Sequence, residues 1–225
     1  MELKGRLKEI SKFVDKGSNI LDLGCDHAYL SIYLVEKGIA SKALASDNKD
    51  EPLLSAKTNI LKSSLSDKIT TIKSNGLDNI DPNLYDTLII AGLGGELIRE
   101  ILKSPKLNKD ATLILEGNNS EKDIREFLDS NNYLITDEEL IVDKGHYYQI
   151  IKAKRMNDDF KMNLDSLELT FGPIILKNKT QIFKEYIERN IGVLENKLTG
   201  INDTVLINKI NYFKGALDYE SKRYN

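Results

Sequence analysis

The sequence has very little cysteine, histidine and tryptophan. Its 225 residues include one cysteine, Cys25, two histidines and no tryptophan. A single cysteine excludes an internal disulfide framework, and so few cysteine and histidine side chains argue against a protein-ligated zinc centre. We therefore expect no metal site.

Long apolar runs are also missing. No stretch approaches the roughly 18 consecutive apolar residues of a membrane span. Three of the first six residues are charged, and the segment lacks the apolar core of a signal peptide. We therefore expect a cytoplasmic protein with no membrane partner.

Neither sign of charge is in large excess. The chain has 32 Lys and Arg against 35 Asp and Glu, a net charge of −3. Hydrophobic residues make up 40% and charged residues 30%, as in a globular protein of one large domain or a domain with an appendage. A nucleic-acid partner would have to bind a local basic patch.

Short apolar runs alternate with helical patterns through the first two-thirds of the chain. This alternation predicts a parallel sheet covered on both faces, and the last two runs, which have no helix between them, would add an antiparallel strand. The predicted strands are residues 19–23, 42–46, 69–73, 86–91, 111–116, 133–142 and 147–154, and the predicted helices are 28–37, a segment from Pro52 through Ile60, 95–103 and 121–130.

The last third has a different pattern. Apolar residues recur every three or four positions over 178–198 and again over 203–221, which predicts two antiparallel helices. Between them, Gly200 is a candidate C-cap, and Asn202 and Asp203 are candidate N-caps. We predict a domain boundary near residue 155, with a Rossmann-like domain over 1–155 and a helical, coiled-coil-like domain over 156–225.

The strongest local pattern is Asp22-Leu-Gly-Cys-Asp-His27, at the end of the first predicted strand. Ligands of open α/β sheets bind at the carboxyl ends of the strands, and Gly24 allows the backbone to approach a ligand closely. Asp47 ends the second predicted strand, where a carboxylate can accept both hydroxyl groups of a ribose. The sequence therefore predicts a nucleoside-containing ligand at this edge.

Two such ligands can be compared. A dinucleotide site has three glycines in a G-x-G-x-x-G pattern, whereas this loop has one glycine between Asp22 and Asp26. These carboxylates would repel a pyrophosphate but attract the ammonium and sulfonium groups of S-adenosyl-L-methionine. The charges favour S-adenosyl-L-methionine, and roles as turn and cap residues are the alternative for both aspartates.

Glycine-containing turns follow two further strands. Asn75-Gly76 follows the third, where the amide could donate to and accept from an adenine ring, although Asn-Gly is also a common turn pair. Ala91-Gly-Leu-Gly-Gly95 follows the fourth, and its small side chains leave room for a flat group beside a methyl donor. A flexible strand–helix connection is the alternative interpretation of this loop.

With these motifs, the sequence resembles the TrmK-type tRNA adenine N1-methyltransferases. Asp22-Leu-Gly-Cys-Asp-His-Ala-Tyr-Leu30 resembles the family's D-I-G-S-D-H-A-Y-L-P block, and residues 91–95 resemble its A-G-M-G-G. The similarity extends from about Leu3 to the helical hairpin, with supporting matches at residues 45–56, 75–77 and 171–173. It implies a class I methyltransferase, with a mostly parallel seven-stranded sheet and a C-terminal antiparallel helical hairpin.

The resemblance also implies methyl transfer from S-adenosyl-L-methionine to N1 of adenine 22 in bacterial tRNA. N1 lies on the Watson–Crick edge, so the base must be unpaired or flipped out. We take Asp26 as the catalytic candidate, because a carboxylate near N1 and N6 would orient the amino group and stabilise developing positive charge. A helix cap is the alternative role for Asp26.

The remaining site residues are assigned to two groups. The expected cofactor-binding residues are Asp22, Gly24, Cys25, His27, Asp47, Asn48, Asn75, Gly76, Gly92 and Leu93. The expected substrate-binding residues are Tyr29, which could stack on the base, and Gly94, Gly95 and Asn118. Candidate phosphate contacts are Arg6, Lys8, Lys49 and Arg99.

Several positions depart from the family pattern. They are Ser31 for a usual proline, Glu51 for a glycine, Asn75 for an acidic residue, residues 116–119 for a Q-P-containing turn near the target base, and His146 and Gln149 in a late K-x-Y-E pattern. These departures keep a different RNA or a small-molecule acceptor open. A non-catalytic binding protein is the third alternative, which the retained Asp22, Asp47 and glycine-rich loop disfavour.

The predicted hairpin carries no chemical motif. The resemblance implies that it clamps or orients the tRNA, and dimerisation through the hairpin is the alternative. We take a monomer as the expectation.

Overall fold

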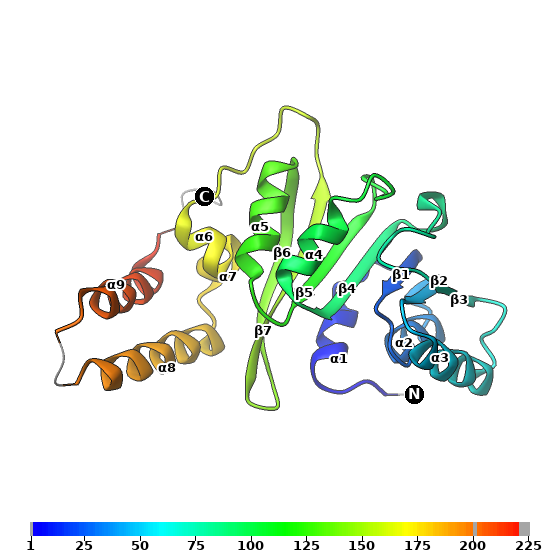
Figure 1. Cartoon of the computed structure of the whole chain (residues 1–225), viewed down its shortest axis with the longest axis horizontal. Helices are drawn as coiled ribbons and strands as arrows, with labels where there is room; N and C mark the ends of the chain where they lie inside the picture. The colour runs from blue at the N-terminus through cyan, green and yellow to red at the C-terminus, as the bar shows by residue number, and fades with distance from the viewer. Residues whose placement is uncertain (1, 200–201, 221–225) are drawn as a thin grey trace.

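The computed structural model describes residues 2–199 and 202–220, and its centre is a seven-stranded sheet (Figure 1). The strand order is β3-β2-β1-β4-β5-β7-β6, with β7 antiparallel to both of its neighbours. The strands are β1 (Ser18–Leu23), β2 (Ala40–Asp47), β3 (Ile69–Lys73), β4 (Thr87–Leu93), β5 (Thr112–Gly117), β6 (Tyr133–Asp143) and β7 (His146–Arg155). The predicted mostly parallel sheet with a reversed strand is confirmed.

Helices cover both faces of the sheet. One face packs against α1 (Gly5–Lys12), α2 (Tyr29–Glu36) and α3 (Asp50–Ser63). The other face packs against α4 (Gly95–Leu102) and α5 (Glu121–Ser130). Strands such as β5 are buried on both faces, which explains their continuous apolar runs.

The order in which strands are added to the sheet reverses at β1. β1 pairs with β2 on one side and with β4 on the other, all in parallel. The loops after these three strands therefore open on the same edge, at the point where α/β sheets bind their ligands.

In the described part of the chain, four helices follow the sheet and form a core of their own. α6 (Ser166–Phe171) and α7 (Pro173–Asn178) lie beside α5 and β6, and α8 (Gln181–Leu198) and α9 (Thr204–Asp218) form the predicted hairpin beyond them (Figure 1). The buried apolar side chains of these helices form one cluster, which also contains Leu140 of β6. Asp203 caps α9 as predicted, because its side chain accepts from the N–H groups of Val205 and Leu206.

Some elements differ from the prediction. α1, α6 and α7 were not expected, because helices of six to eight residues are too short to show a clear period and these three, unlike α2 and α4, do not lie between two predicted strands. β4 extends two residues beyond the predicted strand, to Leu93. The predicted cap Gly200 lies outside the described residues.

No helix in the described part of the chain is long and apolar enough to cross a membrane. Within residues 2–199 and 202–220, no group of three or more His, Cys, Asp or Glu side chains is arranged to hold a metal ion.

Candidate active site

A cavity of about 490 Å³ lies at the carboxyl edge of β1, β2 and β4. The loops after β1, β2, β3 and β4 form most of its wall, and residues of α1, α2, α3 and α4 complete it. All ten predicted cofactor-binding residues line it, together with Asp26 and Tyr29. Sequence patterns more than 60 residues apart are thus brought into one site.

The loop after β1 has an unusual backbone. Gly24, Asp26 and Ala28 have φ values of 78°, 50° and 57°, in the left-handed region. This conformation is strained for a residue with a Cβ, and such strain concentrates at functional sites. The backbone N–H groups of Gly24 and Cys25 both donate to the carbonyl oxygen of Ser46, at 2.8 and 3.0 Å, which holds this loop against β2.

Asp22 lies at the base of this loop and is 6% exposed. The Ser31 hydroxyl, on α2, donates to Asp22 Oδ2 at 2.6 Å. Burial raises the pKa of Asp22 to about 6, and the hydrogen bonds from Ser31 oppose that rise. Ser31, a departure from the family pattern, therefore supports the charged form of Asp22.

This burial predicts a pH-dependent stability cost. The folded-state pKa of about 6 exceeds the ordinary value of 3.8, so ionising Asp22 above both values costs about 3 kcal/mol of folding free energy. As the pH rises from 3.5 to 7.5, the unfolding free energy of wild type should therefore fall by that amount relative to that of Asp22→Asn, which has no carboxyl group to ionise at this position. Urea unfolding across this range measures the shift.

Asp47→Asn is the matched control, since it removes a carboxylate from the same edge at a partly exposed position. A difference between Asp22→Asn and wild type that stays constant with pH would contradict the buried charge.

Three polar and aromatic side chains lie at the cavity wall in more open positions. The Asp26 side chain is 72% exposed, and its Oδ1 lies 3.6 Å from Nε2 of His27. The rings of His27 and Tyr29 lie 5.4 Å apart between centroids. Tyr29 is 42% exposed although it is a large apolar side chain, so its face is available for a flat ligand.

The loops after β2 and β3 supply the next part of the wall. Asp47 Oδ1 accepts from the backbone N–H of Lys49 at 3.0 Å, which leaves its second oxygen free of that turn. Gly76 has a φ of 54°, and its carbonyl oxygen accepts from the Ser74 hydroxyl at 2.8 Å. Asn75 is exposed at the cavity, with a long contact of 3.5 Å to Asp78 Oδ2.

Sequence reasoning missed an ion pair behind the glycine-rich loop. Arg6 Nη1, on α1, lies 3.0 Å from Oε2 of the buried Glu116, which also accepts from the Gly92 N–H at 3.0 Å. Burial raises the pKa of Glu116, and the Arg6 guanidinium opposes the rise. Arg6 also lies over the ring of Tyr148, 4.9 Å from its centroid. Arg6 thus borders the cavity as a fixed cation.

Other predicted residues lie outside the cavity wall. Asn118 accepts from Arg6 Nη1 at 3.0 Å and donates to the carbonyl oxygen of Gly92 at 2.6 Å, so it supports the loop from behind. Gly94 precedes α4, and Gly95 packs against the backbone of residues 119 and 120. Lys8 is exposed away from the cavity, and Arg99 pairs with Asp123 on α5 at 2.6 Å.

The strand order, the antiparallel β7 and the cavity above β1, β2 and β4 define a class I S-adenosylmethionine-dependent methyltransferase fold. The family model TrmK, described as tRNA (adenine(22)-N(1))-methyltransferase, matches residues 20–222. This chain therefore belongs to that family, and the predicted resemblance is confirmed.

Individual relatives support the same family membership. The tRNA (adenine(22)-N(1))-methyltransferase of Bacillus subtilis is 34% identical over 187 residues, which cover 81% of this chain and 79% of the relative. The crystal structure of B. subtilis TrmK covers 96% of this chain and 99% of its own, with 29% identity and a TM-score of 0.84.

Two further structures contain ligands. M. capricolum TrmK in complex with S-adenosyl-homocysteine, the natural cofactor product, is 33% identical with a TM-score of 0.83, covering 97% of this chain and 99% of its own. Streptococcus pneumoniae Sp1610 in complex with S-adenosyl-L-methionine is 31% identical with a TM-score of 0.85, covering 96% and 100%.

Proposed function

We propose that this protein is a methyltransferase that uses S-adenosyl-L-methionine to methylate N1 of adenine 22 in tRNA. The observation that carries the proposal is a single cavity lined by the motif residues of the family to which the chain belongs. The B. subtilis relative is named for this reaction.

The residues present suit S-adenosyl-L-methionine. Asp22 supplies negative charge for its ammonium and sulfonium groups, and Asp47 supplies acceptors for its ribose. Gly92 has a φ of 81° and carries no side chain that would narrow the cavity. A volume of about 490 Å³ lies within the range of small-molecule sites. When bound, the cofactor would supply an electrophilic methyl group.

For the acceptor, the protein's residues mainly position the target adenine. Adenine N1 has an in-plane lone pair, so alignment contributes more than a strong base would. Tyr29 offers an exposed ring for stacking, and the exposed Asp26 carboxylate can accept from the exocyclic amino group and stabilise positive charge on the ring. Arg6 and Lys49, both at the cavity, are the candidate contacts for tRNA phosphates.

The direct test is methyl transfer from labelled S-adenosyl-L-methionine to an unmodified tRNA transcript carrying A22. We expect N1-methyladenosine at position 22 by nucleoside mass spectrometry and position mapping, and no product on a transcript with G22. Methylation of both transcripts would exclude this specificity. Cofactor binding without any transfer to tRNA would indicate a different acceptor.

We further propose that residues 1–155 carry out the reaction and that residues 156–225 orient the tRNA, with the protein acting as a monomer. The exposed Lys184, on α8, and Lys209, on α9, lie on the hairpin and could contact phosphates.

A further inference from the structure

A buried ion pair lies where the sheet meets the C-terminal helices. Arg125, on α5, donates from Nε to Glu138 Oε1, on β6, at 2.7 Å, and both side chains are 0% exposed. Nη2 of Arg125 donates to Oε1 of Gln149, on β7, at 2.6 Å. A charge pair removed from water is stable only when further hydrogen bonds satisfy both partners, so the remaining contacts of this pair are informative.

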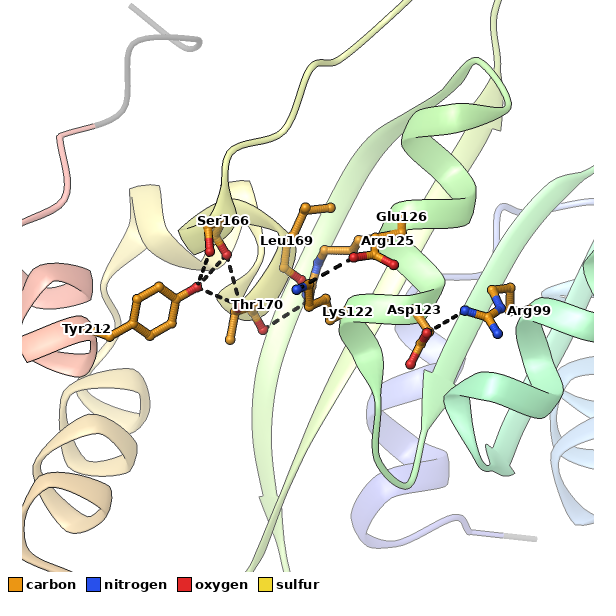
Figure 2. Close-up of polar contacts among 9 residues, drawn as sticks. All are labelled: Arg99, Lys122, Asp123, Arg125, Glu126, Ser166, Leu169, Thr170 and Tyr212. Carbon is orange, nitrogen blue, oxygen red and sulfur yellow. Dashed lines mark hydrogen bonds and ion pairs between the residues drawn. The ribbon is translucent and has the colours of Figure 1, made fainter. Parts of the chain in front are cut away.

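Those contacts are the ends of two helices. Nη1 of Arg125 donates to the carbonyl oxygens of Leu169 and Thr170, at 3.2 and 3.4 Å, in the last turn of α6 (Figure 2). Glu138 Oε2 accepts from the N–H of Ile174, at 3.0 Å, in the first turn of α7. These backbone groups have no partner within their own helices, and each charge has the sign that its helix end prefers.

Gly172 joins the two helices directly over the pair. Its φ is 91°, and a Cβ there would lie 2.6 Å from both Arg125 Nη2 and Glu138 Oε2. The kink between α6 and α7 therefore lies against the ion pair, and the pair fixes both the position and the direction of the two helices.

α6 in turn holds the hairpin. The Tyr212 hydroxyl, on α9, lies 2.9 Å from the Ser166 hydroxyl and 2.8 Å from the Thr170 hydroxyl (Figure 2). The Phe171 ring packs against Phe183 of α8 and Phe213 of α9, at 6.1 and 5.4 Å between centroids. The contacts thus continue from the sheet through α6 to both helices of the hairpin.

We propose that Arg125 and Glu138 are positioning residues that set the orientation of the α8–α9 hairpin relative to the catalytic cavity, and so tune tRNA binding. The inference rests on the proposed function, in which the hairpin orients tRNA. Neither residue lines the cavity. Their effect should therefore fall on tRNA affinity and spare cofactor binding and turnover.

The test uses the full chain with the double substitution Arg125→Met and Glu138→Gln. It removes both charges together, so neither is left buried without a partner, and an amide oxygen stays available to Ile174. We expect KM for tRNA to rise about ten-fold, while kcat and the Kd for S-adenosyl-L-methionine stay within about two-fold. Lys122→Met is the matched control, because this exposed lysine of α5 pairs with Glu126 of the same helix, at 3.6 Å.

Thermal unfolding first establishes that the double variant is folded. A KM within two-fold of wild type in the folded variant would overturn the proposal, as would an equal loss of cofactor affinity, which indicates general damage. If the double variant does not fold, Tyr212→Phe replaces it, since it removes only the bonds of α9 to α6; a KM for tRNA unchanged from wild type would then overturn the proposal.

Small-angle X-ray scattering separates this inference from the proposed function. We expect the double variant to differ from wild type in its distance distribution, with the Lys122→Met profile unchanged. If wild type transfers no methyl group to tRNA, the proposed function is refuted. If the scattering of the double variant still differs from that of wild type in that case, the orienting role is retained. Superimposable profiles of the double variant and wild type would refute the orienting role.

Discussion

Asp26→Ala is expected to lower kcat for methyl transfer by about 100-fold, while the Kd for S-adenosyl-L-methionine stays within about three-fold. The magnitude is that of losing one group that stabilises developing charge at a reacting atom. The side chain is 72% exposed and its carboxylate lies 3.6 Å from His27, so its removal should leave the loop intact. The N-cap residue of α2 is Ala28 and no side chain caps that helix, which disfavours a capping role for Asp26.

Single-turnover kinetics with saturating tRNA, combined with calorimetric titration of the cofactor, separate the two quantities. Asp50→Ala is the matched control, because Asp50 is an exposed carboxylate in the first turn of α3 that pairs with Lys73 and does not line the cavity. Loss of cofactor affinity in Asp26→Ala would assign the residue to the cofactor site instead. Unchanged turnover and unchanged affinity would remove it from both roles.

The parts of the site that the sequence could predict are those where local chemistry and topology agree. A parallel sheet brings the ends of its central strands to one edge, so Asp22, Asp47 and the 91–95 loop had to lie near one another once the strands were identified. Glycine and aspartate at strand ends also mark the turns themselves, without any knowledge of distant contacts.

The parts that could not be predicted depend on contacts between distant segments. Arg6 lies in a short helix before the sheet and meets Glu116, 110 residues later, only because α1 packs against β6 and α2 in the folded chain. Arg125 has the same pattern as any charged residue on an amphipathic helix, yet it is fully buried. Nothing within one element distinguishes such residues from solvated ones, because their partners come from other elements.

The sequence predicts that Gly95 is a substrate-binding residue, whereas its contacts in the structure indicate a packing role. Gly95 was predicted to leave room for the substrate, but it does not line the cavity. A Cβ at this position would lie 2.2 Å from the carbonyl oxygen of Ser120 and 2.7 Å from that of Asn119. The Gly95 N–H also donates to the Asn119 carbonyl oxygen at 3.0 Å. Glycine here lets α4 begin against the loop that follows β5.

Gly95→Ala is accordingly expected to lower the free energy of unfolding by about 3 kcal/mol, because the contacting atoms are backbone and cannot rotate away. The cost is steric, as Gly95 itself has no positive φ. Gly192→Ala is the control: that glycine lies within α8 with no atom near its would-be Cβ, and alanine should stabilise the helix by about 0.5–1 kcal/mol.

Urea unfolding of the two variants and of wild type at one pH measures both effects, and methyl transfer to tRNA is assayed in parallel. A substrate-contacting glycine would give a variant of normal stability with reduced activity. A packing glycine gives a destabilised variant whose activity falls as the 117–120 loop is displaced from α4. Because Asn118 in that loop holds both Arg6 and the Gly92 carbonyl, the displacement should reach the cavity and raise the KM for tRNA as well.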